Sequence, residues 1–178
     1  LTPDKSPHYL SQAVAPLMKE NRDIYLAFLG AGAESYLEKI KAPLKENNVM
    51  DRVRFLPLVP VEKLPAVYSM ADLCAYPDAA SLSRMEASSC LRAVIMSDLP
   101  ASRWRESLGV GRCYRTGNID ELRSMIHELL NNNDKREKIA TIARQAVIDN
   151  FSYKAISEKS IGIMREAIEN KKANGIGR

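Results

Sequence analysis

Short apolar runs alternate with longer stretches of helical periodicity along most of this chain, and no other feature limits its fold as strongly. The apolar runs have the length of strands: 24–29, 53–58, 73–76, 93–96 and a brief fifth at 112–114. The helical stretches lie before, between and after them: 7–20, 34–47, 62–70, 82–90, 122–130, 139–147 and 156–168. This alternation is typical of βαβ units. It predicts an α/β fold, with a Rossmann-like parallel sheet flanked by helices.

The chain has the length of one domain. Its 178 residues are enough for a sizeable core, and the sequence contains no internal repeat or low-complexity linker. We expect one domain over residues 1–170, followed by a disordered basic tail, 171–178. No apolar run approaches the roughly 20 residues that span a bilayer. The first residues lack both an initiating Met and the build of a signal peptide, so we expect that a longer protein was cut before Leu1.

Composition removes several classes of function. The three cysteines, Cys74, Cys90 and Cys113, form no CxxC pair, which predicts reduced, buried thiols rather than a disulfide framework or a zinc site. His8 and His127 are the only histidines, so we expect neither a histidine-rich metal site nor a Ser-His-Asp triad. The net charge of +4 favours a solvated basic surface, with phosphate-bearing ligands or an anionic membrane face as alternative partners. Nucleic acid is not expected as a partner, because only 6% of the residues are aromatic and they do not interleave with a basic stripe.

Ligands of an open parallel sheet bind beyond the carboxyl ends of its strands. The most informative such segment is 76–87, Tyr-Pro-Asp-Ala-Ala-Ser-Leu-Ser-Arg-Met-Glu-Ala, which follows the third strand. It places Asp78 in a strand–helix loop and Glu86 in the first turns of the next helix. Free backbone N–H groups at a helix start suit a phosphate, and carboxylates beside them suit sugar hydroxyls. One site here could hold a pyrophosphate together with the sugars at both of its ends.

The same residues also have purely structural interpretations. Ser83 and Glu86 have the S-x-x-E spacing of a capping box, and Asp78 is a common turn residue. Residues 30–32, Gly-Ala-Gly, follow a strand as a phosphate loop would, but they lack the third glycine of the dinucleotide fingerprint. A tight turn is therefore the favoured interpretation of this segment. Lys5 by itself indicates only an exposed lysine.

In their order and spacing, several segments resemble the C-terminal, nucleotide-sugar donor-binding domain of the group 1 glycosyltransferases, which are retaining enzymes of the GT-B fold. The resemblance extends over nearly the whole chain, and its segments are Leu1–Ser6 (R-L-x-P-x-K-G without its arginine), Phe28–Gly32 (v-G-x-G), Arg54–Leu56 (v-x-F-x-G), Tyr68–Leu73 (Y-x-x-A-D-l), Gly117–Asn118 (G-d) and Asn150–Tyr153 (f-s-w). The family also has a Glu, seven residues and then Glu-Ala. Glu86 with Ala87 matches the second half, and Asp78 stands in the position of the first glutamate. The likeness implies one half of a two-domain GT-B architecture.

The resemblance implies roles for individual residues. Asp78 would contact hydroxyls of the donor sugar, Glu86 the ribose, and Lys5 the leaving pyrophosphate, a task that a metal ion performs in other glycosyltransferases. These three form the implied catalytic set. The implied donor- and phosphate-binding residues are Gly30, Gly32, Ser81, Leu82 and Ser83. No metal and no cofactor are implied, because the nucleoside diphosphate sugar is itself a substrate.

This chain departs from the family pattern at several positions. Asp78 is one methylene shorter than glutamate, and residues 79–81, Ala-Ala-Ser, replace glycines between the two acids. Leu91 and Ala93 replace the glycine and the proline of the family's c-G-x-P-V. Arg84 occupies a usually apolar position, from which it would either add charge near the phosphates or reach solvent.

Three functional hypotheses follow from the sequence. The favoured one is the donor-binding half of a retaining glycosyltransferase that transfers a sugar from a nucleoside diphosphate sugar to an acceptor hydroxyl, with an acceptor domain upstream of Leu1. The resemblance implies a cytoplasmic protein and leaves open a peripheral position at the inner membrane face with a lipid-linked acceptor. The alternative is a non-catalytic nucleotide-sugar-binding or partner domain of the same fold. A receiver-like signalling domain is disfavoured, because residues 30–32 supply no acidic pair after the first strand.

Overall fold

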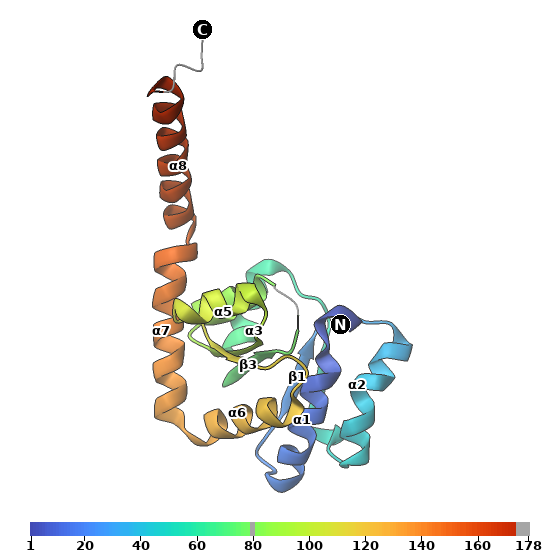
Figure 1. The fold of residues 1–178 in the computed structure, drawn as a ribbon. Coiled ribbons are helices and arrows are strands. Elements are labelled where there is room, and N and C mark those ends of the chain that lie inside the picture. The colour runs from blue at the N-terminus through green and yellow to red at the C-terminus, as the bar shows by residue number, and fades with distance from the viewer. Residues whose placement is uncertain (79–80, 174–178) are drawn as a thin grey trace.

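Parallel strands alternate with helices through the first two thirds of the molecule, and helices alone complete it (Figure 1). The computed structural model describes residues 1–78 and 81–173. The strands are β1 (Leu26–Leu29), β2 (Val53–Leu56), β3 (Leu73–Tyr76), β4 (Ala93–Ser97) and β5 (Arg112–Tyr114). The helices are α1 (Pro7–Glu20), α2 (Glu34–Glu46), α3 (Leu64–Ser69), α4 (Ser83–Ser89), α5 (Pro100–Ser107), α6 (Ile119–Asn131), α7 (Asn133–Phe151) and α8 (Tyr153–Ala173). Short 3-10 helices precede α1, β2 and α3: η1 (Pro3–Lys5), η2 (Met50–Arg52) and η3 (Val61–Lys63).

The described strands form two parallel sheets rather than the one expected. β1 pairs with β2, with Phe28 opposite Phe55 and their rings stacked at 5.3 Å. β3, β4 and β5 form the second sheet in that order, with Ala75 opposite Ile95 and Ile95 opposite Arg112. All pairings are parallel, as the βα alternation predicts.

Helices cover both faces of the strands. α1 packs against α2 and α6, and these three helices share one core with apolar residues of β1, β2 and β4. Val94, the neighbour of Ile95 along β4, faces the opposite side and packs with Tyr68 of α3 and Ala87 of α4. Successive strand residues point to opposite faces, so β4 is buried at each position.

The predicted elements are all present, with ends shifted by a few residues. β2 ends at Leu56, just before Pro57, as the missing N–H of proline requires. Pro43 does not interrupt α2, which continues to Glu46. The expected helix at 62–70 is divided into η3 and the shorter α3.

The last helix, α8, extends away from the rest of the molecule beyond the end of α7 (Figure 1). It contains no buried residue among those whose side chains are described. The helix continues through Ala173, so residues 171–173 of the expected tail are helical. The remainder of that tail, 174–178, lies outside the described residues.

The cysteines differ from expectation in one respect. Cys74, Cys90 and Cys113 are free thiols, but each is half-buried rather than buried. Burial still dominates their chemistry at two positions, because it raises the pKa of Cys74 and of Cys113 to about 12. Over residues 1–78 and 81–173, none of the helices combines the length and the apolar character needed to cross a bilayer.

Candidate functional site

A cavity of about 860 Å³ runs along β1 and β3, and the end at which the carboxyl ends of these strands meet the N-terminal segment is called its mouth. At this mouth it is lined by Lys5, Asp78, Ser81 and Ser83. Lys5 is separated from the other three by more than seventy residues of sequence, and the parallel fold alone brings them together. The carboxyl edge is where a parallel sheet binds ligands, so this mouth is the candidate site.

Ser6 connects the N-terminal segment to the loop after β3. Its backbone is left-handed, with φ of 44°, and this lets η1 turn directly into α1. Its Oγ lies 3.3 Å from Oδ2 of Asp78 and 3.2 Å from the carbonyl oxygen of Pro3. This contact fixes η1, and with it the exposed Lys5, beside Asp78.

Asp78 follows β3 by one residue, Pro77, whose position is itself held by a buried tyrosine. The hydroxyl of Tyr114 on β5 donates to the carbonyl oxygen of Pro77 at 2.6 Å. Burial raises the pKa of Tyr114, so this hydroxyl remains a donor at any ordinary pH. The carboxylate expected to contact the donor sugar therefore has a backbone anchored from across the sheet.

Glu86 lies in the first turn of α4 and does not line the cavity itself. Its Oε2 accepts a hydrogen bond of 2.9 Å from the hydroxyl of Tyr68, which does line the cavity. Burial, followed by this hydrogen bond, raises the pKa of Tyr68 to about 12. The capping-box interpretation of Ser83 and Glu86 is wrong, because the N-cap of α4 is Leu82 and no side chain caps the helix.

The loop between Asp78 and α4 is described only in part. Ala79 and Ala80, which replace family glycines, lie outside the described residues. Ser81 and Ser83 line the cavity, and the carbonyl oxygen of Ser83 accepts a 2.9 Å hydrogen bond from Tyr76. Leu82 is 68% exposed and is not part of the lining.

Arg84 contradicts both expectations made for it, since it neither reaches solvent nor lines the cavity. Its side chain is fully buried, and Nη1 donates to the hydroxyl of Ser102 on α5 at 2.5 Å. Its Nε is 3.3 Å from the carbonyl oxygen of Ser81. Its Nη2 is buried without a hydrogen-bond partner among the described residues. The guanidinium thus joins α4 to α5 beneath the site, and burial lowers its pKa.

Two glycines follow β1; the backbone conformation explains the first, and the close approach of Leu1 explains the second. Gly30 has φ of +114°, a conformation that favours glycine, as a tight turn requires. A Cβ on Gly32 would stand 2.6 Å from the carbonyl oxygen of Leu1, so close approach of Leu1 explains this glycine. Neither glycine lines the cavity, and their predicted contact with donor phosphate stays a prediction.

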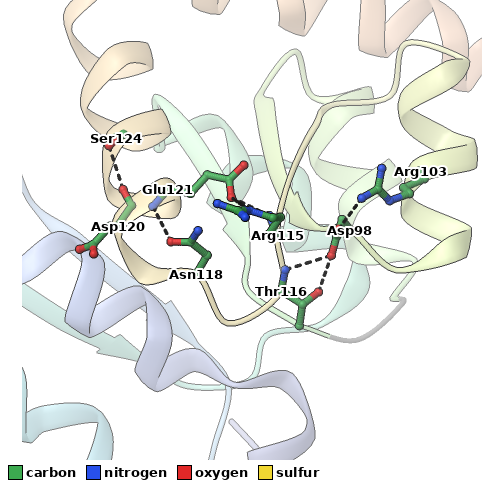
Figure 2. A network of polar contacts seen from close by, with 8 residues as sticks. All are labelled: Asp98, Arg103, Arg115, Thr116, Asn118, Asp120, Glu121 and Ser124. Carbon is green, nitrogen blue, oxygen red and sulfur yellow. Dashed lines mark hydrogen bonds and ion pairs between the residues drawn. The ribbon is translucent and has the colours of Figure 1, made fainter.

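Next to the candidate site, the loops after β4 and β5 are joined by polar contacts (Figure 2). Asp98 Oδ1 accepts from the backbone N–H and the hydroxyl of Thr116 at 3.0 and 2.9 Å, and its Oδ2 accepts from Arg103 at 2.6 Å. The Thr116 backbone N–H is the largest cause that lowers the pKa of Asp98 to about 2. Asn118 caps α6 by accepting from the N–H of Glu121 at 3.1 Å, which accounts for the Gly-Asn turn in the sequence.

Sequence reasoning missed the residues that hold the site in place: Ser6, Tyr68, Tyr76 and Tyr114. Tyr68 stood in a segment that resembles the family, but nothing in its spacing indicated a contact with Glu86, eighteen residues later. Tyr114 ends a strand of only three residues and bonds to a residue thirty-seven positions earlier. Such long-range hydrogen bonds have no periodic signal in the sequence.

The described residues offer no evident metal site. Within the part of the chain that the structure describes, no group of three or more His, Cys, Asp or Glu side chains could hold a metal ion. Lys5 brings a positively charged side chain to the mouth of the cavity.

Comparisons with known proteins agree with the geometry. Residues 1–146 match the family described as Glycosyl transferases group 1. Spore coat protein SA of Bacillus subtilis (strain 168) is 24% identical over 171 residues, which are 89% of this chain and 45% of that protein.

Solved structures give the same fold. Sucrose-phosphate synthase from Thermosynechococcus elongatus superimposes with a TM-score of 0.79 and 21% identity over 95% of this chain and 44% of its own. HepE from Anabaena, solved in complex with UDP-glucose, gives a TM-score of 0.80 and 21% identity over 93% of this chain and 46% of its own. This chain spans less than half the length of each of these three proteins.

Proposed function

This chain belongs to group 1 of the glycosyl transferases, and we propose that it is the donor-binding half of a glycosyltransferase that retains anomeric configuration. Its substrate is a nucleoside diphosphate sugar, from which the sugar passes to an acceptor hydroxyl. The observation that carries the proposal is the convergence of Lys5, Asp78, Ser81 and Ser83 on one cavity mouth at the carboxyl edge of the strands. The HepE structures with UDP, and with UDP-glucose, support the substrate class.

Different residues bind different parts of the donor. Lys5 and the backbone of Ser81–Ser83 bind the diphosphate, Asp78 binds hydroxyls of the sugar, and Glu86 binds the ribose. The cleaved bond leaves negative charge on the diphosphate, and a positive side chain next to that charge stabilises the transition state more than the ground state. Lys5 supplies the positive charge, in place of a metal ion. Asp78 is oriented for its task by the Ser6 hydroxyl.

Tyr68, which lines the cavity, holds Glu86 by a hydrogen bond to one of its carboxylate oxygens. A carboxylate with one oxygen bound to a tyrosine hydroxyl keeps its other oxygen as an acceptor for two ribose hydroxyl protons. The same hydrogen bond also places an aromatic ring in the cavity lining. Gly30 and Gly32 belong to the proposed donor site: Gly32 admits the backbone of Leu1 at close range, and Gly30 forms the turn after β1.

The acceptor side of the reaction belongs to the rest of the protein. An N-terminal domain upstream of Leu1 would complete the cleft, which accords with relatives more than twice as long as this chain. The proposed setting is the cytoplasm, with the inner membrane face and a lipid-linked acceptor as the peripheral variant of the same proposal. The transfer needs water to be excluded between the two halves.

A second candidate is a non-catalytic nucleotide-sugar-binding or partner domain of the same fold. Two observations favour it: an aspartate in place of the first glutamate, and a buried Arg84 that serves packing between α4 and α5. Both candidates bind the donor, so turnover separates them. Sugar transfer by the longer protein that is lost in Asp78→Asn supports the enzyme, whereas donor binding without turnover supports the binding domain.

Donor binding is tested by calorimetric titration with UDP-, GDP- and ADP-sugars. We expect saturable binding of at least one, weakened about tenfold or more by Lys5→Met, because a charged hydrogen bond to phosphate is removed. Lys19→Met is the matched control, since Lys19 is exposed in the last turn of α1 and does not line the cavity. Absence of binding to every donor at millimolar concentration, in a chain that is folded, would refute both candidates.

A further inference from the structure

Two arginines lie close together between α4 and α5. Arg84 of α4 is fully buried, and its Nη1 donates to the hydroxyl of Ser102 on α5 at 2.5 Å. Ser102 and Arg105 are three residues apart, so they share one face of α5. After burial, the positive charge of Arg105 is the largest cause that lowers the pKa of Arg84. The fold therefore brings two like charges together at this contact between helices.

Each of the two guanidinium groups keeps one buried N–H without a hydrogen-bond partner. In Arg84, Nη1 is bonded to Ser102 and Nε lies 3.3 Å from the carbonyl oxygen of Ser81, which leaves Nη2. In Arg105, Nη1 donates to the carbonyl oxygen of Ala101 at 3.0 Å, and Nε is buried and unbonded. Across residues 1–78 and 81–173, these are the only two buried side-chain nitrogens that lack a partner. Because buried donors in folded proteins are nearly always bonded, both atoms indicate an acceptor that the described side chains do not supply.

The acids on α5 and just before it have other partners. Asp98 accepts a hydrogen bond from Arg103, whose side chain turns toward it (Figure 2). Glu106 accepts from the backbone N–H of Cys113 at 2.8 Å, and its Oε1 lies 3.5 Å from Nε of Arg112. Within the described ranges, neither of the two neighbouring guanidinium groups forms an ion pair.

Two uncompensated positive charges at a buried contact are unfavourable. A guanidinium stays ionised in proteins, so it does not avoid the cost of burial by losing its proton. Among the described groups, those that oppose the lowering of the Arg84 pKa are the thiol of Cys113 and the hydroxyl of Tyr76 rather than a carboxylate. A bound negative ion would remove both the repulsion between the arginines and the cost of their unmade hydrogen bonds.

We propose that the contact between α4 and α5 binds a small monovalent anion of the chloride type, through Nη2 of Arg84 and Nε of Arg105. Such an ion accepts both hydrogen bonds and balances charge, whereas a water molecule supplies only the hydrogen bonds. Arg84 and Ser102 are each 0% exposed, so the site is enclosed. A single charge costs less to desolvate than the two charges of sulfate, and this favours the small monovalent ion.

The anion site is distinct from the candidate donor site but adjoins it. Neither arginine lines the 860 Å³ cavity. Nε of Arg84 lies 3.3 Å from the carbonyl oxygen of Ser81, which does line the mouth of that cavity. A bound anion therefore links the loop after β3 to α5, the helix that follows β4. The inference does not depend on which donor the protein binds, so its tests use no donor and a failure of donor binding leaves it intact.

Urea denaturation measures binding of the anion to the folded protein. Sodium chloride replaces sodium gluconate at constant ionic strength, because gluconate is too large for an enclosed site. An ion that binds only the folded state raises the folding equilibrium constant in proportion to its occupancy, and we expect a rise of about tenfold or more at about 0.5 M chloride. A folding constant that is the same in the two salts would overturn the proposal.

Variants of the two arginines separate the site from general salt effects. Arg84→Met and Arg105→Met should each abolish the rise with chloride, whereas Arg144→Met, on the exposed side of α7, should retain it. In gluconate we expect Arg84→Met to be more stable than wild type, because the uncompensated charge is gone, and chloride should narrow that difference. A rise with chloride that persists in both Arg84→Met and Arg105→Met would show that the ion acts elsewhere and overturn the proposal.

Bromide locates the ion directly, because it scatters anomalously and has the charge and nearly the size of chloride. In crystals grown with sodium bromide, we expect an anomalous peak within hydrogen-bond distance of both Nη2 of Arg84 and Nε of Arg105. Density at that position without an anomalous signal would identify a water molecule and overturn the proposal. Sodium sulfate in the urea titration tests the size of the ion: a rise equal to that with chloride, and lost in Arg84→Met, would assign the site to oxyanions and overturn the choice of a small monovalent ion.

Discussion

Gly111 begins the turn into β5 at a point where its backbone touches β4. Its φ is +74°, and a Cβ there would stand 2.6 Å from the carbonyl oxygen of Val94. We expect Gly111→Ala to lower the free energy of unfolding by about 2–5 kcal/mol, because a left-handed alanine costs about 1–2 kcal/mol and overpacking a further 1–3. Urea denaturation followed by circular dichroism measures the loss.

Gly117 is the matched control for this variant. Its φ of +80° is similar, but a Cβ there meets nothing within 4 Å. Gly117→Ala should therefore cost only the backbone part, about 1–2 kcal/mol. Equal losses for the two variants would show that the contact with Val94 carries no energy.

Arg84 is a buried cation without an acidic partner among the described residues. Arg84→Met keeps most of the side-chain volume and removes the desolvation cost of the charge. We expect it to raise the free energy of unfolding by about 1 kcal/mol or more, and the added change Ser102→Ala to raise it further by relieving the stranded hydroxyl. Thermal and urea unfolding measure both steps.

The control for Arg84 is Arg144→Met on the exposed side of α7, which should change the free energy of unfolding by less than about 0.5 kcal/mol. A loss of stability in Arg84→Met that Arg144→Met does not share would mean that the hydrogen bonds to Ser102 and Ser81 outweigh the cost of burial.

At the residue scale, the sequence located the candidate site better than it located the contacts within it. Asp78 and Lys5 line one cavity mouth, as expected of residues at the carboxyl edge of parallel strands. The environments of Glu86 and Arg84 were not predictable, because each depends on a partner from another element: Tyr68 for Glu86 and Ser102 for Arg84. The spacing of Ser83 and Glu86 suggested a capping box, but Glu86 bonds to Tyr68 instead.

Between elements, Asp98 joins the start of α5 to the turn before α6 (Figure 2). Its pKa is lowered to about 2, first by the Thr116 backbone N–H, so its ionised form is favoured by the fold. A carboxyl whose folded pKa is below its unfolded value stabilises the protein above that unfolded value, and the effect is lost as the pH falls through the folded pKa. We therefore expect wild type to be more stable than Asp98→Asn above about pH 4, with the difference vanishing near about pH 2.

Urea titrations at a series of pH values measure this difference, and added salt should reduce only the part due to the exposed Arg103. Asp134→Asn is the control, since that residue stands in the exposed first turn of α7. A wild-type advantage that persists unchanged at about pH 2 would rule out the Asp98 carboxylate as its source.

At the element scale, periodicity was sufficient to predict each strand and every α-helix except α5, but not how the strands pair. Alternation of β and α predicts parallel pairing, which β1–β2 and β3–β4–β5 confirm. The break between β1 and β3 could not be foreseen, because both read as buried strands and pairing order leaves no mark on local composition. Pro43 is a case in which the local sequence misleads: proline disfavours a helix interior, yet α2 continues past it.

For the whole molecule, the α/β fold and the family were confirmed, and they rest on different evidence. The fold follows from hydrophobic burial, which is encoded in each element. The family depends on short segments in a given order, and the match over residues 1–146 ends before α8 begins. The orientation of α8 was not predictable, since a helix with apolar residues at 156, 163 and 164 is expected to bury them, and all three are exposed.

Because α8 extends beyond the body of the molecule, its removal should change shape far more than stability (Figure 1). A helix of 21 residues is about 30 Å long, and small-angle scattering should show the maximum dimension reduced by on the order of 20–30 Å in a protein that ends at residue 152. The free energy of unfolding should fall by about 1 kcal/mol or less, since no described side chain of α8 is buried. Gly162→Ala is the control for shape: open space surrounds that position, so helicity should rise with the maximum dimension unchanged. An unchanged dimension after truncation would mean that α8 folds back onto the body in solution.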